Sequence, residues 1–477
     1  MNPKDSNIAL LLYAIVLVML SFVGISFVYH DWSWGLMDDY NLLTVPGSVW
    51  ERTTALFKSM LANGRFQPTY NFYAASFYHI FEHAPKLFYI LHAGIVCLSL
   101  VVWGYVAYLF TNSRLAFPLF ICVSLSFYKF YDSFFYLSVQ EILGLLFAGC
   151  ACVFNFKAFS GMINNASRIS WPNAVCGLLF LIISFCTKET FLVVGLAWGV
   201  SLLFCGFWFK RNGMILLCGA VLLLLSLSYG IILKAFIVTG YSSAYSFSNF
   251  TKIGGNILNW VQVDLLGHSP WLFLGFLLLV FRLFYLPLNN IRRCGIVLSI
   301  VLYIGYLLVL LPWLTLGHYT IPLAVFFAFS FTLLMSAAIE RVHRGVGFVL
   351  AGGIWVLNLW VAVSAFQVMT TYQADTANLM KWMANNAQFQ YELKAGANAR
   401  ANACEPAERI PQFTNSYYGT TVPSFIFTTG VRDIMADPKT AYFLYGTTWG
   451  DQDLSRIPNL WYPVFISKTW VLFRRLI

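Results

Sequence analysis

The chain has 477 residues, of which 59% are hydrophobic and only 10% charged, and its mean hydropathy is +0.71. A soluble protein of this length cannot bury so much apolar surface, so the composition indicates a membrane protein with many spans. The formal net charge of +10 does not predict a nucleic-acid partner. Its basic residues fall largely in short loops between apolar segments, where the positive-inside rule expects them.

The first apolar run, over 7–28, is too long for the hydrophobic part of a signal peptide. No small-residue cleavage site follows it, only "YHDWSW". We therefore expect a retained membrane helix at the N-terminus.

The loop that follows, over 30–86, contains two stretches in which apolar residues recur at helical spacing. They are "SVWERTTALFKSMLANG" and "YNFYAASFYHIF". Both are too short or too mixed to span a bilayer, so they predict amphipathic helices lying in the membrane interface. Gly64 and Pro68 in "GRFQP" disfavour a continuous helix and should separate the two.

Further apolar stretches bring the expected number of transmembrane helices to about eleven. They lie at 87–110, 115–131, 139–158, 172–187, 190–208, 214–238, 270–288, 294–312, 319–338 and 346–368. The stretches at 115–131 and 172–187 are short for a span.

The loop charges alternate from one side of the predicted bundle to the other. With the N-terminus inside, the inner connections carry Lys4, Arg114, Lys157, Arg168, Lys210, Arg211, Arg292, Arg293, Arg341 and Arg344, with Glu340 as the acidic exception. The outer connections carry Asp31, Asp38, Asp39, Glu51, Glu82, Asp132, Glu141, Glu189 and Asp264. This pattern predicts a cytoplasmic N-terminus and, with an odd number of spans, an outer C-terminal region.

The C-terminal region is less apolar than the rest of the chain. "ADTANLMKWMANNAQFQYEL" has helical periodicity, whereas "PSFIFTTG" and "WYPVFISKTWVLF" alternate as strands do. We therefore expect a transmembrane module over 1–368 and a small outer α/β domain over 369–477.

The motif that points most directly to chemistry is the acid pair Asp38 and Asp39 in "GLMDDYNLL". Two carboxylates in a loop are often merely solvated. These two, however, lie beside a helix end and precede two interfacial helices. Other charged or titratable residues also lie near outer helix ends, namely Asp132, Glu141, Lys188, Glu189 and His318. Charges at membrane depth are costly and tend to mark function.

With an acidic pair in the first outer loop, two interfacial helices, about eleven spans and an outer C-terminal domain, the sequence resembles the GT-C superfamily of integral membrane glycosyltransferases. Members that use polyprenyl-phosphate sugars include protein O-mannosyltransferases, lipid A aminoarabinose transferases and serotype-converting O-antigen glucosyltransferases. In the mannosyltransferases an aromatic residue precedes Asp-Glu. Here Met37-Asp38-Asp39-Tyr40 occupies the corresponding place, with Asp instead of Glu. The layout covers most of the chain, but the motif is only two residues long and does not fix the sugar.

The resemblance implies an all-α polytopic GT-C-like fold in the bacterial inner membrane, with a periplasmic C-terminal domain. It also implies a polyprenyl-phosphate sugar donor, such as an undecaprenyl lipid, and a glycan, lipid or protein acceptor. O-antigen is the preferred acceptor, because the serotype-converting group is most similar in size and layout; lipid A and a protein such as pilin are alternatives. Asp38 would be the general base, since a base must take the proton of the attacking hydroxyl. Asp39 would orient the acceptor or hold a basic neighbour.

The leaving phosphate needs positive charge, and three residues are candidates to bind it: Arg65, Lys188 and His318. Each has a plainer interpretation. Arg65 could contact lipid headgroups, Lys188 could pair with Glu189, and His318 could be structural. Glu141 could bind acceptor hydroxyls or hold Lys188, and Asp132 and Glu189 complete the predicted acceptor side of the site.

No cofactor is expected. A divalent cation would need more ligands than two adjacent acids supply, and no glycine-rich phosphate loop is present. Two other functions remain open. A lipid-sugar transporter or flippase would carry polar residues at the bilayer midplane and often an internal repeat. An O-antigen ligase or polymerase would carry its main outer loop late in the chain.

Overall fold

The computed structural model describes residues 47–62, 64–81, 85–135, 137, 140–163, 169–210, 213–236, 250–262, 277, 288–311, 317–339, 344–401, 410–411, 414–415, 418–427, 439–446 and 460–475. The span expected at 7–28, the acid pair Asp38 and Asp39, and nearly all of the span expected at 270–288 lie outside these residues.

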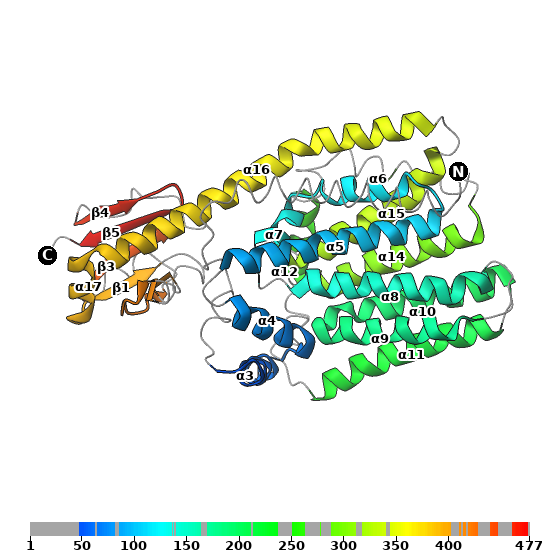
Figure 1. Cartoon of the computed structure of the whole chain (residues 1–477), viewed down its shortest axis with the longest axis horizontal. Helices are drawn as coiled ribbons and strands as arrows, with labels where there is room; N and C mark the ends of the chain where they lie inside the picture. The colour runs from blue at the N-terminus through cyan, green and yellow to red at the C-terminus, as the bar shows by residue number, and fades with distance from the viewer. Residues whose placement is uncertain are drawn as a thin grey trace.

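Long apolar helices packed side by side form the body of the protein (Figure 1). They are α5 (Pro85–Thr111), α8 (Gln140–Ile163), α9 (Trp171–Thr187), α10 (Leu192–Cys205), α11 (Gly213–Phe236), α14 (Asn290–Leu310) and α15 (Ile321–Ile339). Within the described residues, 6 helical segments are long and apolar enough to cross a membrane, and α9 is a shorter apolar helix. The predicted helices in these stretches are confirmed, while the total of about eleven stays a prediction.

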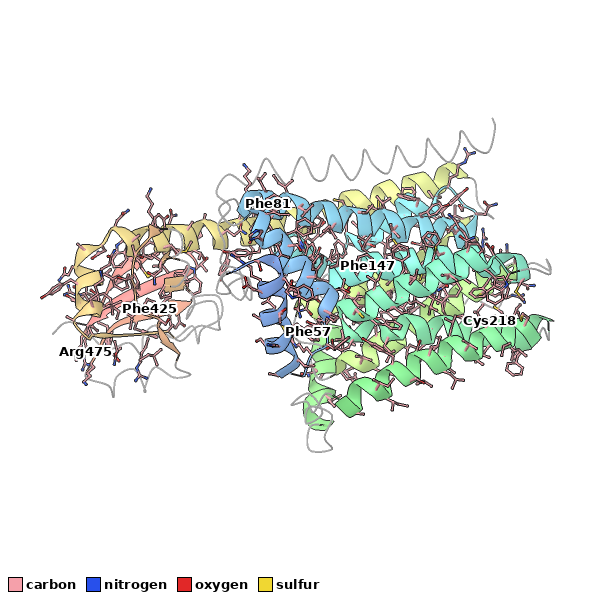
Figure 2. The ribbon with its side chains drawn as sticks, turned by 60° about the horizontal axis from the view of Figure 1, so that its bottom comes forward. Phe57, Phe81, Phe147, Cys218, Phe425 and Arg475 are labelled. Atoms are coloured by element: carbon pink, nitrogen blue, oxygen red, sulfur yellow. The ribbon has the colours of Figure 1, made fainter. Side chains whose placement is uncertain are left out.

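Aromatic and aliphatic side chains fill the space between the bundle helices, as Figure 2 shows around Phe147. Phe147 of α8 stacks on Phe180 of α9, with 6.2 Å between ring centroids. Small residues let helices approach closely: a Cβ at Gly177 of α9 would lie 2.2 Å from Oδ1 of Asn155 on α8. This kind of close contact is how helices associate where lipid removes the hydrophobic driving force.

The stretch predicted to span the membrane over 115–131 is not one continuous helix. This stretch forms α6 (Ala116–Ser124), a turn, and the 3₁₀ helix η1 (Tyr128–Tyr131), which leads into α7 (Asp132–Phe135). A helix of 9 residues is only about 14 Å long, less than half the apolar thickness of a bilayer.

Polar side chains take over the backbone hydrogen bonds where α6 ends. The Ser126 hydroxyl donates to the Cys122 carbonyl at 2.8 Å, and the Tyr131 hydroxyl donates to the Leu125 carbonyl at 2.9 Å. Ser126, Phe127, Phe130 and Tyr131 are buried, so protein shields the irregular backbone after α6, as irregular backbone within a membrane would require. Hydropathy alone cannot reveal such a break.

α3 (Val49–Ala62) and α4 (Pro68–Phe81) confirm the two helices predicted in the first loop. α3 begins with a capping box. The Glu51 carboxylate accepts from the Ser48 backbone N–H and hydroxyl, both at 2.8 Å, and these bonds lower the pKa of Glu51. Both helices lie at the end of the bundle nearest the C-terminal sheet (Figure 1; Phe57 marks α3 in Figure 2).

The helix α12 (Phe250–Trp260) lies in a connection where no helix was expected. The Asn256 side chain donates to the Leu311 carbonyl at 3.3 Å, at the end of α14. α12 therefore also lies at the end of the bundle that carries α3 and α4 (Figure 1).

α16 (Arg344–Asn385) is a continuous helix of 42 residues that runs from the bundle to the C-terminal sheet (Figure 1). The domain boundary expected at 368/369 therefore falls inside a helix. Hydrogen bonds fix its far end to the sheet: Asp375 accepts from the Thr469 N–H at 2.8 Å, and Thr376 accepts from the Trp470 indole at 2.9 Å.

The described residues of the C-terminal region form α17 (Ala387–Lys394) and a five-stranded sheet in the order β2-β1-β3-β5-β4. The strands are β1 (Asn398–Ala401), β2 (Ile426–Phe427), β3 (Thr440–Gly446), β4 (Trp461–Ile466) and β5 (Trp470–Arg475). β1 is parallel to β2 and β3, whereas β5 is antiparallel to β3 and β4. Strands thus form within both segments predicted from alternation.

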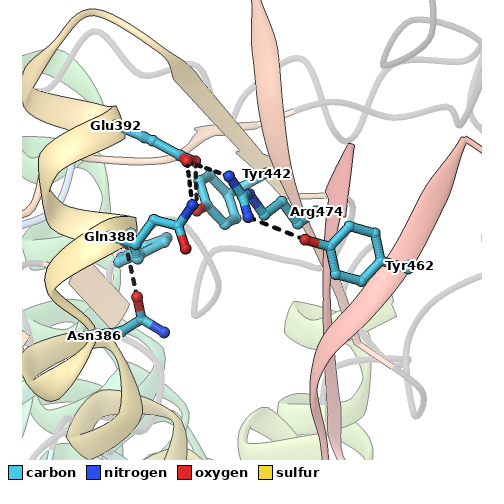
Figure 3. Close-up of polar contacts among 7 residues, drawn as sticks. Asn386, Gln388, Glu392, Tyr442, Tyr462 and Arg474 are labelled. Carbon is cyan, nitrogen blue, oxygen red and sulfur yellow. Dashed lines mark hydrogen bonds and ion pairs between the residues drawn. The ribbon is translucent and has the colours of Figure 1, made fainter. Parts of the chain in front are cut away.

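A polar cluster joins α17 to the sheet (Figure 3). Glu392 accepts from the Tyr442 hydroxyl at 2.7 Å and from Gln388 at 3.0 Å, and it forms an ion pair with Arg474. Arg474 also donates to the Tyr462 hydroxyl at 3.0 Å. Burial and the hydrogen bond to the Glu392 carboxylate raise the pKa of Tyr442.

Candidate functional site

The chain passes back and forth through the bundle and brings distant polar residues to the same end. The turn between α3 and α4, the start of α8, the junction between α9 and α10, and the 3₁₀ helix η9 (Gly317–Thr320) all lie at the end nearest the C-terminal sheet (Figure 1). Arg292 lies at the opposite end, where it donates to the Thr111 carbonyl. The side of the membrane that each end faces remains a prediction.

A helix-ending turn positions Arg65. The Arg65 N–H donates to the Met60 carbonyl at 2.8 Å, the Gly64 N–H donates to the Leu61 carbonyl at 2.9 Å, and Gly64 has a φ of 76°. This is a Schellman motif, which needs a residue that tolerates the left-handed conformation. Pro68 then opens α4, where its missing N–H costs nothing. The predicted break at "GRFQP" is therefore confirmed.

Two cationic side chains meet at one tyrosine. The Arg65 guanidinium donates to the Tyr319 hydroxyl at 3.2 Å. The Lys188 ammonium lies over the ring of the same tyrosine, 4.0 Å from its centroid. A ring face attracts a cation more strongly when both are removed from water, so Tyr319 draws together two residues that are far apart in sequence.

Lys188 is held in place by the way α9 ends. Its backbone is extended, and the 3₁₀ helix η2 (Glu189–Phe191) follows directly. The Ser184 hydroxyl donates to the Gly144 carbonyl at 3.0 Å, which ties the end of α9 to the start of α8. The ring of Phe191 packs against Gly144 so closely that a Cβ there would lie 2.2 Å from it.

The buried Lys188 forms an ion pair with Glu141 at the start of α8. The side chains are 5% and 1% exposed respectively. Charges this deeply buried are tolerated only when they are paired. Of the two partners that the sequence left open for Lys188, the carboxylate in contact is therefore Glu141.

Glu189, the neighbour in sequence, has a different contact. Its carboxylate accepts from the Gln67 side chain at 3.3 Å, across the gap between η2 and the start of α4. The next residue, Thr190, donates to the Tyr306 hydroxyl of α14 at 3.3 Å. The cluster thus contains two cations and two carboxylates, held between neutral side chains from four parts of the chain.

For the other predicted site residues, the structure describes only the backbone position, or the residue lies outside the described part of the chain. Asp132 begins α7, and His318 lies in η9 beside Tyr319. Asp38 and Asp39, the predicted base and its neighbour, lie outside. Among the residues that the structure places, no group of three or more His, Cys, Asp or Glu could hold a metal ion.

Sequence reasoning missed Tyr319, Gln67 and Tyr306. Two of them adjoin predicted residues: Tyr319 follows His318, and Gln67 is two positions after Arg65 and directly before the proline that opens α4. A search for polar residues next to candidate charges could have found these two. Tyr306 lies within an apolar stretch, where an aromatic residue carries no such signal.

Replacing Gly144 with alanine tests how the junction at Lys188 is held. The added methyl group would overlap Phe191, so Gly144→Ala should lower the free energy of unfolding by about 1–3 kcal/mol. The matched control is Gly94→Ala on α5, where nothing lies within 4 Å of the new Cβ. Thermal unfolding in detergent should separate the two variants, and equal melting temperatures would contradict the packing described.

No protein-family model matches the sequence, and no curated protein matches it. Among solved structures, the chain is similar to the oligosaccharyltransferase of Archaeoglobus fulgidus, which was crystallised with zinc and sulfate. The two are 11% identical, with a TM-score of 0.44 over 94% of this chain and 71% of that one. The function is therefore inferred from the site itself.

Proposed function

We propose that this protein is an integral membrane glycosyltransferase of the GT-C type. It would transfer a sugar from a polyprenyl-phosphate donor to an acceptor hydroxyl on the periplasmic side of a bacterial inner membrane. The observation that carries this proposal is the convergence of Arg65 and Lys188 on Tyr319, at the end of an apolar bundle and beside an interfacial helix. A lipid of this kind carries its phosphate at the membrane surface, which is where this end of the bundle is proposed to lie.

Departure of the lipid phosphate leaves negative charge that the enzyme must stabilise in the transition state. Arg65 is half-buried, so it can reach a phosphate at the membrane surface. Its planar guanidinium can donate hydrogen bonds to two phosphate oxygens at once. Lys188 lies deeper and acts through its charge across the Tyr319 ring. Glu141 holds Lys188 in position through their buried ion pair.

The acceptor hydroxyl needs a base, and Asp38 is proposed for that role with Asp39 orienting the acceptor. O-antigen is the acceptor to test first, because the size and helix layout of the chain resemble the serotype-converting glucosyltransferases. Lipid A and a protein such as pilin follow. The C-terminal sheet, which α16 carries beyond the bundle (Figure 1), is proposed to help select the acceptor.

Sugar transfer by the purified protein in lipid nanodiscs tests the proposal. The donors are labelled undecaprenyl-phosphate sugars, and the acceptors are purified O-antigen, lipid A and pilin. A transporter would move the labelled lipid between leaflets without forming a product. A ligase or polymerase would transfer a preassembled glycan but not a single sugar.

Removing the guanidinium tests the phosphate site. Arg65→Ala should raise the KM for the donor roughly 10- to 100-fold, because hydrogen bonds to charged groups contribute about 1.5–3 kcal/mol. Arg65→Lys should recover part of the loss, since lysine keeps the positive charge but lacks the planar guanidinium that donates two parallel hydrogen bonds. Steady-state kinetics at limiting donor measure both.

Lys58 offers a matched control because it is an exposed basic residue on α3. Lys58→Ala should leave the KM for the donor unchanged. If Arg65→Ala behaves as Lys58→Ala does, then Arg65 is only a lipid anchor and the phosphate site is wrong.

A further inference from the structure

Two fully buried amide side chains beside the cluster have polar atoms without a hydrogen-bond partner among the described residues. They are Oε1 of Gln67 and both Oδ1 and Nδ2 of Asn71, and each residue is 0% exposed. Buried polar atoms in native proteins are nearly always paired, so an unpaired group calls for an explanation. These three atoms, on the residue directly before α4 and in the first turn of α4, lack the polar partner that their burial calls for.

The two amides continue the cluster away from its charges. The Asn71 N–H donates to the Gln67 carbonyl at 3.0 Å, so Asn71 in α4 lies one helical turn after Gln67, the residue that directly precedes the helix. Nε2 of Gln67 donates to Glu189. Gln67 therefore lies between Glu189, which it contacts, and Asn71, whose side-chain amide forms no hydrogen bond with the described residues.

We propose that Gln67 and Asn71 form a subsite for the hydroxyl groups of the donor sugar; this rests on the proposed function. A carboxamide both donates and accepts hydrogen bonds, and so does each hydroxyl of a sugar ring. The amides carry no charge, so they do not compete with Arg65 and Lys188 for the phosphate. The lipid phosphate and the sugar are thus recognised by separate groups of side chains.

The proposal is tested by comparing lipids with and without a sugar. The probes are undecaprenyl phosphate and its glucosyl, mannosyl and aminoarabinosyl forms, and binding to the protein in nanodiscs is measured directly. The wild-type protein should bind at least one glycosylated form more tightly than the bare phosphate. Asn71→Ala should reduce this preference about tenfold, the effect of roughly two neutral hydrogen bonds, and should leave binding of the bare phosphate unchanged.

A second buried asparagine provides the matched control. Asn155 of α8 is 1% exposed and its Nδ2 also lacks a partner among the described residues, but it packs against Gly177 rather than beside the cluster. Asn155→Ala should leave the preference for the glycosylated lipid intact. Should Asn71→Ala fail to fold, Gln67→Met keeps the volume of the side chain, removes its polar atoms, and should also lower the preference, though by less, because only Oε1 of Gln67 lacks a partner among the described residues.

The outcomes separate this inference from the proposed function. If the wild-type protein binds bare and glycosylated phosphates equally, or if Asn71→Ala weakens both to the same extent, the sugar subsite is refuted while the phosphate site stands. If the wild-type protein binds neither lipid, the proposed function fails and the subsite fails with it.

Discussion

Asp38→Asn should lower the single-turnover rate of sugar transfer about 10²–10⁴-fold, the usual contribution of general-base catalysis. Asparagine keeps the size and much of the hydrogen bonding of the side chain, but it cannot accept the proton of the attacking hydroxyl. Donor affinity should change little, because other residues are proposed to bind the phosphate. Transfer from a labelled undecaprenyl-phosphate sugar and donor binding are measured on the same preparation.

The neighbouring acid is the matched control for this substitution. Asp39→Asn should be milder if Asp39 only orients the acceptor. If Asp39→Asn is inactive and Asp38→Asn is normal, the two roles are exchanged. If both variants transfer sugar at the wild-type rate, the acid pair is a solvated loop and the enzymatic mechanism proposed here is wrong.

Glu141→Gln should lower the free energy of unfolding by about 3–5 kcal/mol, because it leaves a buried ammonium without its carboxylate. The side chains of Glu141 and Lys188 are both almost fully buried, so water cannot replace the lost partner. Equilibrium unfolding in mixed detergent micelles measures the loss. A variant as stable as the wild type would show that another group, such as Glu189, compensates Lys188.

Removing both charges separates stability from function. The double variant Glu141→Gln with Lys188→Met should regain most of the lost stability, since no uncompensated charge remains. Its transfer rate should stay low, because the positive charge above Tyr319 is gone. Full activity in the double variant would show that the ion pair is structural and plays no part in binding the phosphate.

Some features of this protein follow from local chemistry and were visible in the sequence. Hydropathy identified the apolar helices because a membrane segment must be continuously apolar over its length. The turn that presents Arg65 was also readable, because Gly64 ends one helix and Pro68 opens the next within a few residues. Such signals act over one or two helical turns, and they predict where elements begin and end.

Other features depended on contacts between distant parts of the chain. Helix α6 ends after Ser124 because Ser126 and Tyr131 satisfy the freed carbonyls inside a protein-lined space, although the stretch is apolar enough to predict one continuous helix. α16 continues past the expected boundary because Asp375 and Thr376 fix it to the sheet. Neither the hydrogen bonds after α6 nor those between α16 and the sheet produce a periodic sequence pattern from which they could be predicted.

The partners within the site were likewise decided by the tertiary structure. Glu189 is adjacent to Lys188 in sequence, but the backbone at this junction directs it toward Gln67, and Lys188 pairs with Glu141 from another helix. This pairing is possible because Gly144 lets Phe191 pack directly against α8. The sequence thus determined which charges lie at this end of the bundle, whereas close packing between helices decided which of them meet.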